Sequence, residues 1–453
     1  MRSDVSAWTP RRLADCATWI SGGTPSKKNR DYWDGDIPWV SAKDMKSFRL
    51  HDSVDHITER AVDDGAKLVP RDSILLLVRG MTLNNDVPIC MTDRQMALNQ
   101  DLKALLPADD VDAHFLAYWL LANKPQLLSS VEHAGHGTGK LATPVLQSMQ
   151  IALPPLSEQR AIAAVLGSLD DKIALNRRMN RTLESLARAW FQSWFVDFDP
   201  VHANAAGRPT LPPDLAALFP ATFTPSPLGD IPEGWEVKPV GDIVDCVGGG
   251  TPSTKNDDYW EGGTHHWATP KDLSSLDAPI LTTTNRKLTD AGVGKVSSGL
   301  LERGTVLMSS RAPVGYLAIA DVPVAVNQGF IAMKPTDAMP ASFLLNWCQH
   351  NMETIKSQAG GTTFAEISKK AFRPIPMLVP PPGVASRFAE IVGPMYARIT
   401  LNVRESETLA ALRDALLPRL LSGELPAPAD RDDLPPVEPT VRGNPGRSPV
   451  APA

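Results

Sequence analysis

Gly22-Gly23-Thr24-Pro25-Ser26 occurs twice in this chain of 453 residues, because residues 249–253 have the same five amino acids, 249 − 22 = 227 positions later. The surrounding residues recur too: Lys28-Asn29, Asp31-Tyr32-Trp33 and Gly35 return as Lys255-Asn256, Asp258-Tyr259-Trp260 and Gly262. Further matches are Trp39 with Trp267, Lys43-Asp44 with Lys271-Asp272, Asn99-Gln100 with Asn327-Gln328, Gly137-Thr138 with Gly361-Thr362, and Pro154-Pro155 with Pro380-Pro381. Solenoid units have about 20–50 residues. The spacing therefore indicates two copies of a whole domain.

Each copy begins with a part that has mixed secondary-structure signals, residues 1–152 and 235–378. Short apolar runs such as 74–78 and 305–308 are punctuated by Gly, Pro, Asn and Asp, as is typical of strands. Helical stretches at 113–121 and 341–348 interrupt them. We predict an α+β fold with two mixed α/β domains. Residues 199–234, rich in Pro, Ala and Gly, are predicted to be a linker, and the Pro-rich residues 424–453 a disordered tail.

A heptad pattern follows each domain, over residues 153–198 and 379–423. The first seam is Ile162, Leu166, Leu169, Ile173, Asn176, Asn180, Leu183, Ala187, Trp190 and Trp194. The second, at a constant offset from the first, is Phe388, Val392, Met395, Ile399, Asn402, Ser406, Leu409, Arg413, Leu416 and Leu420, with Arg413 as its charged exception. Alternating steps of four and three are typical of a coiled coil. The matched seams predict an antiparallel two-helix coiled coil, about 60 Å long for 40 residues, that separates two pseudo-twofold related domains. The alternative is that each helix covers only its own domain.

Asn176 and Asn402 occupy equivalent seam positions. In an antiparallel pair with pseudo-twofold symmetry, equivalent residues face each other only near the centre. We therefore predict that the two asparagines meet and fix the register of the helix pair, a known role of a buried polar seam residue. The alternative is that both side chains point to solvent.

Composition narrows the class of protein. The four cysteines form no Cys-x-x-Cys pair, no secretory segment opens the sequence, and no apolar run approaches the roughly 20 residues of a membrane span, so we expect a cytoplasmic protein. The net charge of −6 argues against a general basic coat for nucleic-acid binding, but local basic patches remain compatible with DNA binding.

Motifs of catalysis are missing from the sequence. Gly137-Thr138-Gly139-Lys140 lacks the leading glycine and the final Ser or Thr of a phosphate loop. His133 with His136, and His265 with His266, have no companion ligands at metal-site spacing. Nucleophile-elbow, dinucleotide and adenine-methyltransferase signatures are also lacking. We expect no catalysis, metal or cofactor in this chain alone.

The repeated Gly-Gly-Thr-Pro-Ser with its Tyr-Trp, Trp and Lys-Asp resembles the target recognition domains of type I restriction–modification specificity subunits. Residues 153–162, Leu-Pro-Pro-Leu-Ser-Glu-Gln-Arg-Ala-Ile, resemble that family's entry into its conserved helix. Residues 193–198 and 417–425 are similar to the ends of its two helices. The second copy departs from the pattern, because residues 383–387, Gly-Val-Ala-Ser-Arg, replace Ser-Glu-Gln-Arg.

The resemblance implies that each domain reads one half of a split, asymmetric DNA target and that the helix pair sets the gap between the halves. It also implies double-stranded DNA and two modification subunits as partners, which methylate adenine with S-adenosylmethionine. Two restriction subunits that use ATP and Mg would complete the complex. The alternative is a free-standing bipartite DNA-binding or antirestriction scaffold protein.

Candidate DNA contacts are polar and basic residues near the repeated loops. They are Thr24, Ser26, Lys27, Lys28, Lys43, Arg79 and Lys140 in the first copy, and Thr251, Ser253, Thr254, Lys255, Lys271, Arg311 and Thr362 in the second. The alternative for the shared Gly-Gly-Thr-Pro residues is a turn that both domains need. Arg79 and Arg311 end strand-like runs and are the preferred base contacts, since Arg commonly reads guanine.

The end of the first helix is rich in aromatic residues. Because aromatics are enriched at protein interfaces, we predict a subunit interface there. Its residues are Trp190, Phe191, Trp194, Phe195 and Phe198.

Overall fold

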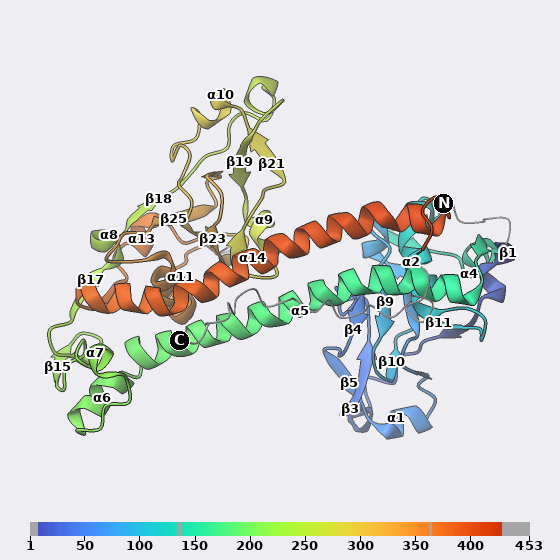
Figure 1. Cartoon of the computed structure of the whole chain (residues 1–453), viewed down its shortest axis with the longest axis horizontal. Coiled ribbons are helices and arrows are strands. Elements are labelled where there is room, and N and C mark those ends of the chain that lie inside the picture. The colour runs from blue at the N-terminus through green and yellow to red at the C-terminus, as the bar shows by residue number, and fades with distance from the viewer. Residues whose placement is uncertain (1–7, 135–136, 362–364, 428–453) are drawn as a thin grey trace, which may run out of the picture. The chain divides into compact units, whose positions relative to one another are not determined.

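The computed structural model describes residues 8–134, 137–361 and 365–427 (Figure 1). The chain forms two compact units. Unit 1 comprises residues up to 170 and those from 410 onward, and unit 2 comprises residues 171–409. Each unit holds one copy of the repeated domain and a segment of each of two long helices. We call the elements from β1 to β14 domain 1 and those from β17 to β26 domain 2.

Domain 1 is built on a five-stranded sheet, in the order β2-β11-β7-β9-β4, and a four-stranded sheet, in the order β5-β3-β10-β6. Strand pairs β1-β14 and the sheet β12-β13-β8 complete it. The strands are β1 Thr9–Arg12, β2 Ala17–Ser21, β3 Trp33–Val40, β4 Arg49–Leu50, β5 Asp55–Ile57, β6 Leu68–Val69, β7 Ile74–Leu77, β8 Arg79–Gly80, β9 Ile89–Thr92, β10 Met96–Leu98, β11 Leu102–Pro107, β12 Glu132–Ala134, β13 Thr138–Lys140 and β14 Gln150–Leu153. The helices are α1 Glu59–Asp63, α2 Ala113–Ala122, α3 Lys124–Ser129 and α4 Thr143–Ser148, with 3-10 turns at Leu13–Asp15, Arg30–Tyr32 and Met81–Asn84.

Domain 2 repeats the five-stranded sheet and the terminal strand pair, but its second sheet has three described strands in place of four. Its five-stranded sheet has the order β18-β25-β22-β23-β20, a three-stranded sheet has the order β21-β19-β24, and β17 pairs with β26. The strands are β17 Glu236–Pro239, β18 Asp245–Val247, β19 His265–Ala268, β20 Ile280–Leu281, β21 Arg286–Leu288, β22 Val306–Ser310, β23 Val314–Ala320, β24 Val324–Val326, β25 Phe330–Lys334 and β26 Pro376–Val379. The helices are α8 Val240–Ile243, α9 Pro270–Ser274, α10 Asp290–Val293, α11 Ala341–His350, α12 Met352–Ser357 and α13 Lys369–Phe372, with a 3-10 turn at Asp257–Tyr259. The predicted pair of mixed α/β domains is confirmed.

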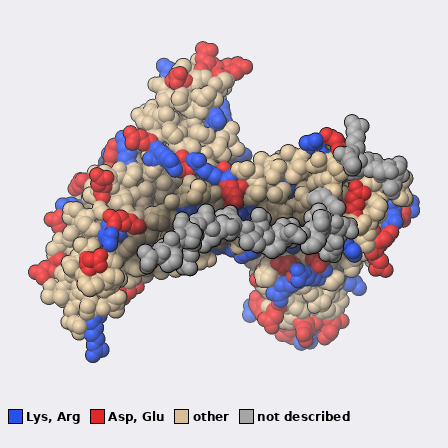
Figure 2. Space-filling model, in the orientation of Figure 1, with Lys and Arg blue, Asp and Glu red and all other residues tan. Residues whose placement is uncertain are grey.

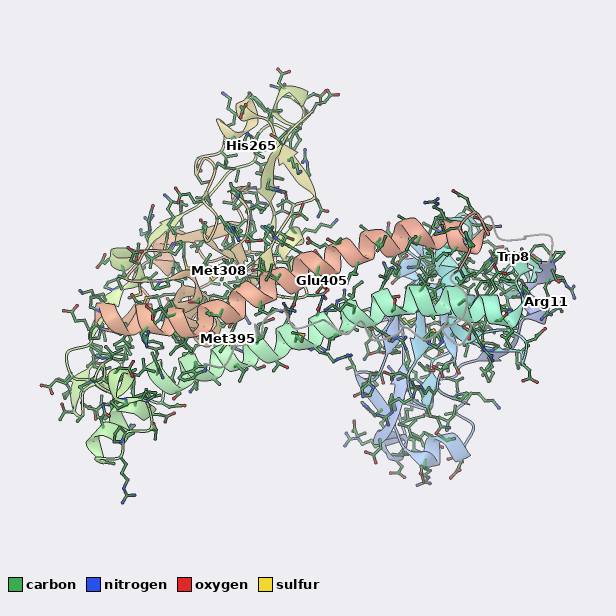
Figure 3. The ribbon with its side chains drawn as sticks, viewed as in Figure 1. Trp8, Arg11, His265, Met308, Met395 and Glu405 are labelled. Atoms are coloured by element: carbon green, nitrogen blue, oxygen red, sulfur yellow. The ribbon has the colours of Figure 1, made fainter. Side chains whose placement is uncertain are left out.

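The core of each domain lies on its central apolar strand. All four residues of β7 and all five of β22 are buried, which explains why both runs lack the polar alternation of a half-exposed strand. Helix α2 covers the core of domain 1, and Asp112 caps it by accepting hydrogen bonds from the backbone of His114 and Phe115. Met308, labelled in Figure 3, is one of the core residues that β22 contributes to domain 2.

The two heptad segments form the long helices α5, Leu156–Phe195, and α14, Pro382–Leu421, of 40 residues each. In unit 2, Asn176 of α5 contacts Asn402 of α14, whereas Phe191, further along α5, packs on Phe388 with ring centroids 6.0 Å apart. Ascending positions in α5 thus meet descending positions in α14, so the helices pair antiparallel in this unit. In unit 1, Ile162 and Leu166 share a core with Leu420. The predicted antiparallel helix pairing is confirmed within the units.

Domain 1 has its own attachment to α5. The buried Gln159 accepts a hydrogen bond from Asp112 N at 2.8 Å and donates to the carbonyls of Pro154 and Asp110, at 2.8 and 3.2 Å. Glu158 accepts from the indole of Trp8 at 3.1 Å, and Figure 3 shows Trp8 at the corresponding end of α5. Glu158 and Gln159 are thus structural residues of domain 1. Alignment of Arg160 with Arg387 places Ala385 and Ser386 at the corresponding positions of domain 2.

The segment 199–234 is more structured than the linker that its composition suggested. It contains helices α6 Asp199–Ala205 and α7 Pro213–Ala216 and the strand pair β15 Phe223–Ser226 and β16 Gly229–Pro232. The segment contributes Leu215, Phe219 and Ile231 to the core of unit 2. Its overall content of Pro, Ala and Gly does not reveal these separate apolar residues. Most of the predicted tail, residues 428–453, lies outside the described residues.

Candidate nucleic-acid interface

The repeated Gly-Gly-Thr-Pro turn is required by close backbone packing. A Cβ atom on Gly22 would lie 2.0 Å from the carbonyl oxygen of Asn99, and one on Gly249 would lie 1.6 Å from that of Val326. The second glycine is less restricted: a Cβ on Gly23 would meet nothing within 4 Å. Gly22 and Gly249 therefore allow each turn to pack directly on backbone. In domain 1 this is the backbone of Asn99, and in domain 2 it is that of Val326, the residue before the Asn-Gln pair.

Two tryptophans hold the turn in each domain. The Trp39 indole donates to Gly23 O at 3.0 Å and Trp267 to Gly250 O at 3.1 Å. Trp33 and Trp260 donate to the carbonyls of Ser26 and Ser253, at 3.2 and 2.9 Å. In each domain the two rings pack edge to face, with centroids 5.2 and 5.0 Å apart. The shared tryptophans are thus explained by the turn they anchor.

The repeated Asn-Gln pair completes the turn. The Thr24 hydroxyl donates to Gln100 Oε1, and the Thr251 hydroxyl donates to Gln328 Oε1 at 2.6 Å. No partner for the amide nitrogen of either glutamine lies among the described residues. A fixed amide oxygen leaves the NH2 group free to donate outward, as a base or phosphate contact requires. Gln100 and Gln328 are therefore further candidate contacts, which the sequence-based candidates did not include although the Asn-Gln pair is repeated.

In the Lys-Asp repeat, the aspartate has a structural role in both domains, whereas the lysine forms an ion pair in domain 1. Asp44 accepts from Ser41 N and Oγ, both at 2.9 Å, and Asp272 accepts from Thr269 N and Oγ1 at 2.8 and 2.6 Å. Lys43 forms an ion pair with Asp55 at 2.8 Å, and this hydrogen bond raises the pKa of Lys43.

In domain 2, a cation occupies the position of the aspartate that pairs with Lys43 in domain 1. Trp267 pairs in register with Arg286, as Trp39 pairs with Asp55 in domain 1, so Arg286 takes the place of Asp55. The Arg286 guanidinium lies 3.5 Å from the centroid of the Trp260 ring. Lys271 is exposed and has no ion pair with another described residue. This region is therefore more positive in domain 2.

Arg79 and Arg311 lie beside the Asn-Gln loop. The residue before each arginine bonds to that loop: Val78 N donates to Asp101 O at 2.9 Å, and Ser310 N to Gly329 O at 2.8 Å. Arg79 is exposed and Arg311 is partly exposed. The structure thus brings the turn, the Asn-Gln loop and the strand-ending arginine together on one surface in each domain. We call this the loop surface.

The other predicted contacts have simpler positions. Ser26, Lys27 and Lys28 follow the turn of domain 1 with exposed side chains, as do Ser253, Thr254 and Lys255 in domain 2. Lys140 pairs in register with Arg79. Thr362 lies outside the described residues.

The two seam asparagines lie in a buried polar layer of unit 2. Both are 0% exposed. Asn176 Nδ2 donates to Glu405 Oε2 at 2.8 Å and to Asn402 O at 3.4 Å, and Asn402 Nδ2 donates to Asn180 Oδ1 at 2.8 Å. The hydrogen bond from Asn176 lowers the pKa of Glu405, which Figure 3 labels on α14. The side chains point into the helix pair and not to solvent, and they contact through Asn180 and the Asn402 carbonyl.

The predicted aromatic interface needs correction. Phe191, Trp194 and Phe195 are buried in the core of unit 2, where they surround Phe388. Aromatic content does not distinguish an interface from a core at a helix end, and these three side chains are used by the chain itself. Trp190 and Phe198 are partly exposed and remain candidates for a partner contact.

Charges of both signs mix over the face of the molecule in Figure 2. In the described part of the chain, no group of three or more His, Cys, Asp or Glu residues could hold a metal ion. His265 contacts Asp290 and His266 contacts Thr284, while His136 is not among the described residues. None of the helices described is long and apolar enough to span a membrane.

Comparisons with known proteins agree with this architecture. A family model described as "Type I restriction modification DNA specificity domain" matches residues 6–185 and 232–411, which is most of the chain. The chain therefore belongs to this family, and it is a DNA specificity subunit with two target recognition domains.

Relatives match over most of their length. The chain is 26% identical to the type I restriction enzyme MjaIX specificity subunit of Methanocaldococcus jannaschii, over 92% of this chain and 93% of that protein. It is also 26% identical to the type I restriction enzyme HindI specificity subunit of Haemophilus influenzae, over 77% and 84%. A crystal structure of the S subunit of a type I restriction-modification system from M. genitalium has the same fold, with a TM-score of 0.51 at 16% identity over 91% and 96% of the two chains.

Proposed function

We propose that each target recognition domain reads one half of a bipartite, asymmetric DNA target. The observation that carries this proposal is the loop surface, which occurs twice on the same framework but with different exposed charges. Asp55 and Lys140 of domain 1 have Arg286 and Glu366 as their counterparts in domain 2. Surfaces with different charges favour different base edges, so the two half-sites should differ.

The helix pair is proposed to set the gap between the half-sites. Support comes from the buried layer around Asn176 and Asn402, since a register slip would break the hydrogen bonds that their two buried amide nitrogens donate. On this proposal Asn176, Asn180 and Asn402 fix the register, and the spacer length of the DNA target follows from it.

The chain is further proposed to dock two modification subunits that methylate adenine, and two restriction subunits. S-adenosylmethionine, ATP and Mg would be bound by those partners, and the catalytic pocket for a flipped base would be theirs. Trp190 and Phe198 are the proposed partner contacts at the end of α5, since both keep part of an aromatic ring exposed.

Methylome sequencing of host cells with and without this gene tests the proposal. We expect a two-part methylated adenine motif with unlike halves that disappears with the gene. Copurification then separates the subunit from a free-standing scaffold. Two methyltransferase chains bound to this one support the subunit, whereas a stable monomer that binds its own site alone supports the scaffold.

A further inference from the structure

The strand-ending arginine has a cross-strand partner in each domain. In domain 1, β8 pairs with β13 so that Arg79 lies directly opposite Lys140. In domain 2, the same connection is made by an antiparallel bridge between Arg311 and Glu366. Each of the two residues also has a partner on its other side: Lys140 lies opposite Glu132, and Glu366 lies opposite Gly360. Lys140 and Glu366 are thus equivalent positions on the two loop surfaces. They are 366 − 140 = 226 residues apart, which is also the offset between the two heptad seams, 388 − 162 = 226.

The pair in domain 1 carries two like charges. Arg79 and Lys140 are exposed, and within the described ranges neither side chain forms an ion pair or hydrogen bond. Like charges directly opposite each other destabilise a strand pair. Glu132 lies across from Lys140 and Asp101 follows Gln100, but neither carboxylate pairs with the two cations. The geometry leaves two cationic donors beside the outward amide of Gln100.

The pair in domain 2 has opposite charges. Arg311 Nη1 lies 3.7 Å from Glu366 Oε2, and the Glu366 side chain is 48% exposed. Domain 2 has Gly329 where domain 1 has Asp101, and Arg311 Nε lies 3.5 Å from the place of the missing Cβ. The arginine is therefore packed over Gly329, and the Glu366 carboxylate keeps acceptor capacity toward solvent.

These two arrangements suit different base edges in the major groove. Guanine presents two acceptors, N7 and O6, which match two cationic donors. Cytosine presents the N4 amino donor, which matches a carboxylate acceptor. We propose that Lys140, acting with Arg79, selects guanine in one half-site, and that Glu366, held by Arg311, selects cytosine in the other. This inference rests on the proposed function, since it assigns bases within the proposed target.

Charge exchange at one position at a time tests the assignment. The full chain is expressed with its modification subunits, and the methylated motif is read from the methylome. The purified complex is also bound to a randomised duplex pool. We expect Lys140→Glu to change the preferred base at one position of one half-site, and Glu366→Lys to change one position of the other half. Loss of each original preference should be roughly 10- to 100-fold.

Controls separate base reading from general charge and from misfolding. Lys67→Glu and Glu353→Lys make the same charge changes at exposed residues of domains 1 and 2 that do not belong to the loop surface, and should leave the motif unchanged. Glu366→Gln keeps the side-chain shape and should relax the choice of base without replacing it. Assembly with the modification subunits, together with an intact other half-site, shows that a variant is folded.

The outcomes distinguish the two proposals. If the wild-type complex has no sequence preference, the proposed function itself is wrong. If the wild type reads a bipartite motif but both charge exchanges leave it unchanged, only the assignment of Lys140 and Glu366 is overturned. An equal loss of affinity for all sequences, with a salt slope smaller by about 1, also overturns it, because it identifies Lys140 as a phosphate contact.

Discussion

Arg413 is the charged exception in the apolar seam of α14, and the structure explains why unit 1 keeps it. Its Nη1 donates to Asp170 Oδ1 at 2.6 Å, while the Tyr118 hydroxyl donates to Asp170 Oδ2 at 2.7 Å. The side chain of Asp170 is 10% exposed and that of Arg413 is 25% exposed. Burial opposes the charge of Arg413, but hydrogen bonding and attraction to Asp170 raise its pKa overall.

Arg413→Leu restores an apolar seam residue but leaves the Asp170 carboxylate with Tyr118 alone. Breaking a buried ion pair by removing one partner costs about 3–5 kcal/mol. Arg413 is a quarter exposed, so water replaces part of the lost interaction, and we expect a loss of about 2–3 kcal/mol for unit 1. Arg419→Leu is the matched control, because its ion pair with Glu424 is exposed and should contribute no more than about 1 kcal/mol.

The loss is measured by hydrogen exchange at the α2 amides, which reports the opening of unit 1. A local measurement is needed because a chain with two units need not unfold in one step. The triple variant Tyr118→Phe/Asp170→Leu/Arg413→Leu should recover most of the loss, since apolar side chains can replace a buried ion pair at little cost and no buried hydroxyl is then left without an acceptor. Equal protection in Arg413→Leu and Arg419→Leu would refute the reasoning. A triple variant less stable than Arg413→Leu would equally show that Asp170 is not left uncompensated.

Three further predictions concern the turn, the polar layer and the aromatic core. Gly22→Ala should abolish soluble domain 1 or shift its sheet, whereas Gly23→Ala should be tolerated, as judged by thermal unfolding, because only the first Cβ meets backbone. The lowered pKa of Glu405 stabilises the fold above its unfolded value of about 4.3, and this contribution is lost as pH falls through the folded pKa. Glu405→Gln should therefore make acid unfolding of unit 2 less steep below that unfolded value. Trp194→Ala should cost unit 2 about 3–5 kcal/mol in urea unfolding, and Trp190→Ala clearly less, since Trp194 is 0% exposed and Trp190 is partly exposed.

The elements that could be predicted from the sequence are those with a strong period or an exact repeat. The heptad segments appear as α5 and α14 within a few residues of their predicted ends. The apolar run from Ile74 appears as β7, because a fully buried central strand needs no polar alternation. These signals depend on local spacing alone, so one sequence suffices to read them.

Other features depend on tertiary contacts that spacing does not encode. Phe191 and Trp194 have the composition of an interface, but Phe388, on the second long helix, encloses them in a core. The ion pair of Arg413 could not be predicted, because the sequence does not show that Asp170 faces it. Glu366 was missed because a search for repeated residues discards positions where the copies differ, and its partner in register is known only from the strand pairing.

The contacts also explain which residues could diverge after the duplication. Gly22, Trp39 and Asp44 each bond to, or pack against, the backbone of their own domain, so substitution there would disturb the turn in either copy. Lys140 and Glu366 have exposed side chains, whereas their strand pairing is made by the backbone, so their exchange should leave that pairing intact. If each domain reads one half-site, as we propose, selection for a new half-site can act on such exposed charges without a large cost to folding. Two domains with one framework and unlike charges are the expected product, and on that proposal an asymmetric target follows from the same physical separation between framework and surface.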